Sequence, residues 1–267
     1  MKNKIIWSIG ILASLLCLYF LLSAILTKPQ SPQPTEPSAP QITEPEVTEP
    51  PVTEPEVTQP PHSSLYIPDL SVEDVITYFN EVCLDSEFTT GGDPSVVQKW
   101  TGAIYYTLDG NYTDTDITVL NRFADWLNTI EGFPGIFEST GPHLTTLRIH
   151  FCTQKEMVNI MGSNFNHMDG GVTYWYEENA IYDATICYRT EIDQYTRNSV
   201  ILEEIYNGLG PIQDTLLRPD SIIYQNFSEP QELTAVDELI LRLLYHPSIR
   251  PGMNSDECAQ IIRQLYY

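Results

Sequence analysis

The pattern of apolar and polar positions predicts helices at both ends of the region that follows residue 64. Apolar residues recur there every three or four positions, which is the spacing of one buried helix face. Thr234 with Asp237 resembles a capping box, in which side chains satisfy free backbone N–H groups of the first turn, and Ser255 is expected to cap the last helix. The predicted helices cover residues 71–82, 115–130, 200–209, 234–246 and the segment after 255.

Alternation of apolar with polar residues predicts strands between these helices. Leu147, Ile149 and Phe151 point to one side of a strand, with Arg148 and His150 on the other. The short EEN sequence between the last two predicted strands indicates a hairpin. The order of elements predicts an α+β fold, with a mixed sheet of about four strands and flanking helices. The predicted strands are residues 102–110, 144–152, 172–176 and 180–189.

The N-terminal segment predicts a membrane anchor. Residues 5–27 form a run without a charged side chain. As a helix, a run of this length is long enough to cross a hydrocarbon core of about 30 Å. A signal peptide would have a shorter apolar core and small residues before its cleavage site. For a cut after Ala24, the third residue before the cut should be small, but Leu22 stands there. We therefore favour an uncleaved signal anchor over a cleaved peptide. Lys2 and Lys4 precede the span, so residues 1–4 are expected inside the cell and the remainder outside.

Residues 28–63 predict an extended stalk. From Thr43 the sequence TEPEV-TEPPV-TEPEV-TQPPH repeats every five residues. Proline at this density favours the polyproline helix, which rises about 3.1 Å per residue and would reach on the order of 100 Å. A ligand for a proline-binding module is the weaker alternative. The remaining residues, 64–267, are expected to form one extracellular domain of ordinary size.

Composition narrows the range of partners. The chain has 36 Asp and Glu against 13 Lys and Arg, a formal net charge of −23. Such a surface repels nucleic acid, and no calcium-loop pattern is present. The only membrane contact expected is through the N-terminal helix. The domain cysteines could form two disulfides in any of three pairings or remain as buried thiols, and the sequence leaves both open: Cys83, Cys152, Cys187 and Cys258.

The helix at VILEEIYNGLG contains the candidate chemistry. At roughly 100° per residue, its apolar side chains share a buried stripe, while Glu203, Glu204 and Asn207 share the opposite edge. Gly210 supplies the left-handed residue that ends the helix, and Pro211 prevents its continuation. Two interpretations follow. The polar edge is either a solvent-exposed face or the lining of a cleft.

A zinc peptidase would place H-E-x-x-H on a helix in this position, because two histidines one turn apart bind the metal and the glutamate activates water. Here Leu202 and Tyr206 occupy the two histidine positions. The histidines of the chain lie elsewhere, and no two of them are close enough in sequence to form a pair of metal ligands. The sequence therefore predicts neither a metal site nor a cofactor.

The second half of the domain resembles a bacterial family known as domain of unknown function 2927. The resemblance is dense over residues 196–255, where EEIYNGLG, PDSIIY and LTAVDELILRLLYHPSIRPGM follow the family pattern. Leu202 departs from that pattern, which commonly has histidine there, and Asn207 departs from glutamine. The matching positions are Glu203, Glu204, Leu209, Gly210, Asp214, Asp220, Ser221, Asp237, Gly252 and Met253.

The resemblance implies an exported domain with a zincin-like fold. Without the histidine, the expected role is a binding or scaffold module at the cell envelope, whose partner is an envelope peptide or protein. The alternative is an envelope hydrolase that uses Glu203 as general base, with its pKa raised by Glu204. The candidate catalytic residues are thus Glu203 and Glu204. The candidate binding residues are Asn207, Asp214, Asp220, Ser221 and Asp237.

Overall fold

The computed structural model describes residues 6–7, 63–84, 95–141, 144–226 and 229–267. The chain divides into two units, and everything described below belongs to the unit made of Met1–Ala13 and His62–Tyr267. The other unit, Ser14–Pro61, lies outside the described residues. The stalk and the anchor therefore stay predictions.

Two residues of the expected membrane span are described. Ile6–Trp7 form strand β1, which pairs antiparallel with β6; the other residues of the span lie outside the described residues. Within the part of the chain that the structure describes, no helix combines the length and apolar character needed to cross a bilayer.

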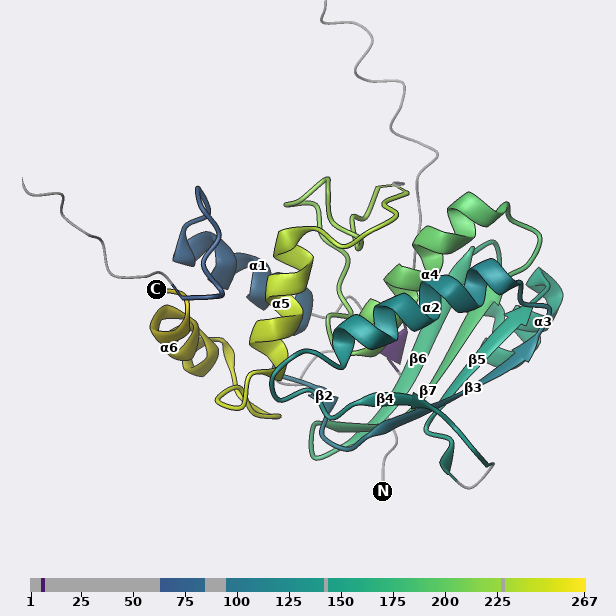
Figure 1. Ribbon diagram of the computed structural model, residues 1–267, viewed down its shortest axis with the longest axis horizontal. Helices are drawn as coiled ribbons and strands as arrows, with labels where there is room; N and C mark the ends of the chain where they lie inside the picture. Colours follow the sequence, from purple (N-terminus) through teal and green to yellow (C-terminus); the bar gives the residue numbers. More distant parts are fainter. Residues whose placement is uncertain (1–5, 8–62, 85–94, 142–143, 227–228) are drawn as a thin grey trace, which may run out of the picture. The chain divides into compact units, whose positions relative to one another are not determined.

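The described strands form one sheet in the order β1-β6-β7-β5-β3-β4, with β2 paired to the start of β7 (Figure 1). Strand β7 is parallel to β5 and β2, and β3 is parallel to β5 and β4. Only β6 and β1 bring antiparallel pairings. The sheet is therefore mostly parallel. Its strands after β1 are β2 Lys99–Trp100, β3 Ile104–Gly110, β4 Ile136–Glu138, β5 Leu147–Cys152, β6 Gly170–Glu177 and β7 Ala180–Arg189.

The predicted count of about four strands is wrong, because the sheet has seven within the described ranges. The four predicted strands are the four long ones, β3, β5, β6 and β7. The missed strands are only two or three residues long, which is too short to show alternation. The predicted hairpin joins β6 to β7, where Glu178 and Asn179 both have positive φ, 50° and 65°. That conformation matches the right-handed twist of the flanking strands.

Helices cover both faces of the sheet (Figure 1). Helices α2 and α4 pack on one face, over the buried side chains of Leu147, Ile149 and Phe151. The opposite face carries α3 and a smaller core that contains both Cys152 and Cys187. Helices α1, α5 and α6 gather beside the sheet. The helices are α1 Val72–Leu84, α2 Asp114–Leu127, α3 Gln154–Met161, α4 Gln194–Gly208, α5 Ala235–Tyr245 and α6 Ser255–Leu265, with a 3-10 turn at Ser163–Phe165.

The sequence left open whether the domain cysteines form disulfides or remain as thiols. In this structure all four are buried free thiols: Cys83, Cys152, Cys187 and Cys258.

Capping explains where the C-terminal helices begin. The predicted box of Thr234 with Asp237 is confirmed at α5. At α6 the prediction was wrong by one residue: Asn254 is the cap, and its Oδ1 accepts from the N–H groups of Asp256 and Glu257 at 3.0 and 3.1 Å. Asparagine and serine are equally good caps, so two adjacent candidates cannot be ranked from the sequence.

The two ends of the folded domain are joined to each other. The Tyr266 hydroxyl donates to the carbonyl of Leu70 at 2.7 Å and accepts from the N–H of Ile67 at 3.3 Å. Nearby, Arg263 forms two hydrogen bonds with the carboxylate of Glu73, at 2.8 and 2.9 Å. Helix α6 is therefore fastened to the first residues of the domain.

Candidate acidic pocket on helix α4

Helix α4 is held at both ends by local chemistry. The carboxylate of Asp193 accepts hydrogen bonds from the N–H groups of Tyr195 and Thr196 and caps the first turn. After the helix, Gly210 has φ of 130°, and a Cβ there would lie 2.5 Å from the carbonyl oxygen of Gln98. Glycine is required here by both backbone conformation and space. The predicted helix end at Gly210 is confirmed.

The polar edge of α4 is covered. Asn207 is fully buried, Glu204 is 4% exposed and Glu203 is partly buried. Of the two sequence interpretations, the solvent-exposed face is therefore wrong. The sheet covers one side of the helix and α2 packs beside it, and residues of the segment between α4 and α5 share a pocket with its polar edge.

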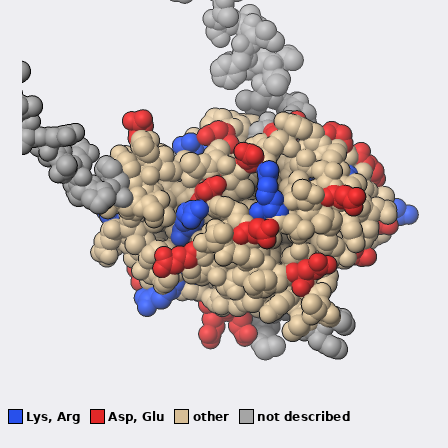
Figure 2. Space-filling model, in the orientation of Figure 1, with Lys and Arg blue, Asp and Glu red and all other residues tan. Residues whose placement is uncertain are grey.

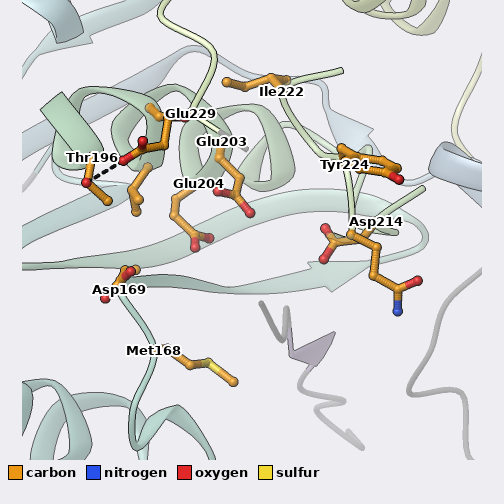
Figure 3. A pocket seen from close by; sticks show the side chains of 13 residues that line it. Met168, Asp169, Thr196, Glu203, Glu204, Asp214, Ile222, Tyr224 and Glu229 are labelled. Atoms are coloured by element: carbon orange, nitrogen blue, oxygen red, sulfur yellow. Dashed lines mark hydrogen bonds between the residues drawn. The ribbon is translucent and has the colours of Figure 1, made fainter. Parts of the chain in front are cut away.

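A small pocket lies against this edge, with room of about 50 Å³ for the centres of water-sized molecules. Among the residues that the structure describes, five carboxylates line it and no Lys or Arg does. Figure 3 shows Glu203 and Glu204 directed between Asp169 and Asp214. From α4 the lining residues are spaced at helical intervals: Thr196, Ser199, Val200, Glu203 and Glu204. The first residue of β6 and the two residues before it contribute Gly170, Met168 and Asp169, and the segment between α4 and α5 contributes Asp214, Ile222, Tyr224, Gln225 and Glu229.

Two of the five carboxylates are anchored at the pocket wall. Glu229 accepts a hydrogen bond of 2.5 Å from the hydroxyl of Thr196 (Figure 3). Asp169 forms an ion pair with Arg189, with Nη1 and Oδ1 3.1 Å apart. Glu204 differs from both, because its Oε2 is buried and has no hydrogen-bond partner among the described residues. A buried polar atom without a partner is costly.

The glutamates have perturbed acidity. Burial raises the pKa of Glu203 well above its ordinary value, and the carboxylates of Asp214 and Asp169 raise it further. Burial likewise raises the pKa of Glu204, and Glu203 and Asp214 add to the rise. Neighbouring carboxylates disfavour one another's charged form, so the pocket favours bound protons or another positive charge.

The two positions at which a zinc peptidase would carry histidine face elsewhere. Leu202 is buried and borders a separate shallow groove with Phe123 and Trp126. Tyr206 is fully buried, and its hydroxyl donates to the carbonyl of Asp237 at 3.1 Å. Neither residue lines the acidic pocket. Among the described residues, no three or more His, Cys, Asp or Glu side chains are grouped so that they could hold a metal ion.

Two predicted binding residues form a buried structural network. The Ser221 hydroxyl accepts from the Tyr78 hydroxyl at 2.8 Å and donates to Asp237 at 2.7 Å. Asp237 also accepts from the N–H of Ile222 at 3.2 Å and from Thr234. Both Ser221 and Asp237 are fully buried. The network therefore fixes the Ile222 wall of the pocket to the start of α5.

The structure sorts the sequence candidates into separate places. Glu203, Glu204 and Asp214 meet in the pocket. Asp220 is exposed and hydrogen-bonded to Arg218 at 3.0 Å, away from the lining. Asn207 is buried within α4 but is not among the lining residues.

Sequence reasoning missed six polar lining residues that come from three parts of the chain. One signal was available for Asp169: two consecutive glycines follow it, and glycine at a strand start indicates close approach of another segment. Two of the others lie in α4 ahead of the predicted helix, and three lie in the segment between α4 and α5, which has no periodicity. The missed residues are Asp169, Thr196, Ser199, Tyr224, Gln225 and Glu229.

Comparison with known proteins gives one result. The family model described as "Protein of unknown function (DUF2927)" matches residues 72–264, from the first residue of α1 to the last turn of α6. No curated protein and no solved structure matches the chain.

Proposed function

The chain belongs to the DUF2927 family, and we propose that it is a binding or scaffold module whose ligand occupies the acidic pocket on α4. The observation that carries this proposal is the buried Oε2 of Glu204, which has no hydrogen-bond partner among the described residues. Folded proteins satisfy nearly all buried polar atoms, so an unsatisfied carboxylate oxygen at a pocket supports a site built for something else to bind.

The proposed location is the outer face of a cell membrane, with the N-terminus inside and an envelope peptide or protein as partner. Support comes from the uncharged segment 5–27, the basic residues before it and the proline-rich stalk after it. Protease protection in intact cells tests this orientation. The domain should be cleaved from outside, and a protected domain would contradict the proposal.

Capture from the cell envelope tests the binding function. Full-length protein is immobilised and incubated with envelope digests, and retained molecules are identified by mass spectrometry. We expect the wild type to retain a ligand that Glu204→Gln does not. Glu232→Gln is the matched control, because it removes the same charge from a side chain that is 78% exposed. Equal capture by all three proteins would overturn the proposal.

A hydrolase is the second candidate, and one observation favours it. Burial and nearby carboxylates raise the pKa of Glu203 beside the pocket, and a carboxyl group that titrates nearer neutrality is suited to general acid–base catalysis. Glu203→Gln should then abolish turnover of envelope peptides. Unchanged turnover in this variant would remove the hydrolase.

The proposed module has a zincin-like fold that lacks the zinc-binding histidine. The positions of Leu202 and Tyr206 outside the pocket support a function without zinc. Calorimetric titration of the full-length protein with zinc should show no stoichiometric binding of sub-micromolar affinity. Such binding would contradict the absence of a metal site.

A further inference from the structure

The pocket offers a ligand an unusual set of partners. Its five carboxylates accept hydrogen bonds when ionised, and none of the basic side chains in the described part of the chain lines it to balance their charge. Acidic side chains also lie across the surface of the domain, interspersed with a few basic ones (Figure 2). A neutral or anionic ligand would leave the carboxylates uncompensated. A cation would satisfy their hydrogen bonds and their charge together.

The charge of the unsatisfied Glu204 carboxylate can be compensated in two ways within the pocket, whereas a water molecule could supply only a hydrogen bond. A proton can bind to it, which its raised pKa favours, or a cationic donor can approach Oε2. These two outcomes compete, because each supplies the missing positive charge. A cationic ligand would therefore displace protons from the Glu203 and Glu204 pair when it binds.

The size of the pocket limits the cation. A buried water needs about 10–15 Å³ of such space, so the room of about 50 Å³ corresponds to a few water molecules. That volume accommodates an ammonium group with its first methylene groups. The walls suit an alkyl stem, since apolar side chains line the pocket beside the carboxylates: Met168, Val200, Ile222 and the ring of Tyr224.

The arrangement of the carboxylates favours an organic cation over a metal ion. Metal ions such as calcium need several oxygens at about 2.3–2.6 Å from one point, and no such group of three side chains exists among the described residues. Two carboxylates are already engaged, Glu229 with Thr196 and Asp169 with Arg189. An ammonium group donates hydrogen bonds of about 2.7–2.9 Å to separate oxygens. It therefore does not need several carboxylate oxygens gathered around one point.

We infer that the pocket binds a primary alkylammonium group, of the kind carried by a lysine side chain, with Glu203 and Glu204 as its direct acceptors. This inference rests on the proposed function of the same pocket. It adds the chemical class of the ligand and the release of protons on binding.

Calorimetric titration of full-length protein with Nα-acetyl-lysine amide tests the inference. Ionic strength is fixed, and two buffers of different ionisation enthalpy are compared so that released protons are counted. We expect binding with net proton release. Affinity should rise with pH by up to about tenfold per pH unit for each proton released. The probe stays cationic throughout, because a lysine ammonium has a pKa of about 10.4.

Three controls decide the outcome. The probe acetylated on its ε-nitrogen is neutral and should not bind. Glu204→Gln should weaken binding of the charged probe at least about tenfold, the usual order of effect for a lost charge-assisted hydrogen bond. Glu232→Gln should leave binding unchanged, since it removes an equal charge from an exposed side chain that does not line the pocket.

Four results would overturn the inference. Equal binding of the neutral probe, or equal losses in both variants, would mean that the pocket does not select an ammonium group. Binding of calcium or zinc at this site without binding of the charged probe would replace the ligand class but leave the proposed binding function standing. Absence of probe and metal binding, together with equal envelope capture by the wild type and Glu204→Gln, would overturn both.

Discussion

Gly170 at the start of β6 lies directly against Glu204 of α4. A Cβ at position 170 would be 2.9 Å from Cγ of Glu204, 3.0 Å from its Oε1 and 2.3 Å from Cγ1 of Val200. The absence of a side chain on β6 is therefore what lets the glutamate lie between the helix and the sheet. The pocket depends on this contact as much as on its carboxylates.

Gly170→Ala should destabilise the fold by about 1–3 kcal/mol, the usual cost of forcing an extra methyl group into a packed site. Chemical denaturation measures the change in the free energy of unfolding. Gly102→Ala is the matched control, because a Cβ there meets nothing within 4 Å, and its effect should stay within about 0.5 kcal/mol. Equal effects of the two substitutions would contradict the close contact of β6 with α4.

Glu204→Gln should stabilise the protein, increasingly so as pH rises. The folded-state pKa of Glu204 is raised by burial and then by Glu203 and Asp214. The stability contributed by its bound proton is therefore full below the ordinary pKa of 4.5 and is lost as pH rises through the folded value. Each unit of the rise corresponds to about 1.4 kcal/mol. Glutamine has no proton to lose.

Denaturation curves from pH 4 to 8 check this prediction. The difference in unfolding free energy between Glu204→Gln and the wild type should grow with pH over this range. Glu232→Gln should track the wild type, because its carboxylate is exposed. A constant difference across the range would show that Glu204 has the same pKa in the folded and unfolded states.

Ser221→Ala should destabilise the fold by about 1–3 kcal/mol, because it leaves the buried Asp237 carboxylate and Tyr78 hydroxyl without a shared partner. Asp220→Asn, the exposed neighbour, should change stability by less than about 0.5 kcal/mol. Thermal or chemical unfolding separates the two. If Ser221→Ala left stability unaltered, the network would not be what holds the Ile222 wall in place.

Leu202→His should neither create a zinc site nor bring activity. Leu202 is 3% exposed and borders the groove with Phe123 and Trp126 rather than the acidic pocket. Histidine there would lose apolar packing and bury a polar ring, so we expect destabilisation of about 2–5 kcal/mol, as for other losses of a core leucine. Calorimetry with zinc is the readout, and stoichiometric binding gained by the variant would contradict this geometry.

The periodic parts of the fold could be predicted, because each needs only a run of regularly spaced apolar residues. Helices α1, α2, α5 and α6 and the four long strands all lie where the pattern places them. The helical wheel of α4 also placed Ile201, Leu202 and Ile205 in the core. Strands β2 and β4 have two and three residues, and their pairing is determined by neighbours distant in sequence.

The pocket could be predicted only in part. The wheel grouped Glu203, Glu204 and Asn207 as one polar edge, but it could not say what covers that edge. In the fold, Asn207 is enclosed by neighbouring elements, whereas Glu203 and Glu204 meet carboxylates from the residue before β6 and from the segment before α5. Such meetings depend on tertiary packing, which overrides local pattern.

The contacts of Tyr266 with Ile67 and Leu70, and of Arg263 with Glu73, have a mechanical consequence. A pull on the chain at residue 63 would load these bonds first, because they join α6 to the segment that leads into α1. None of these five residues lines the pocket, which lies between α4, the start of β6 and the segment before α5. Tension along the chain would therefore be borne at the ends of the domain before it could alter the spacing of the carboxylates.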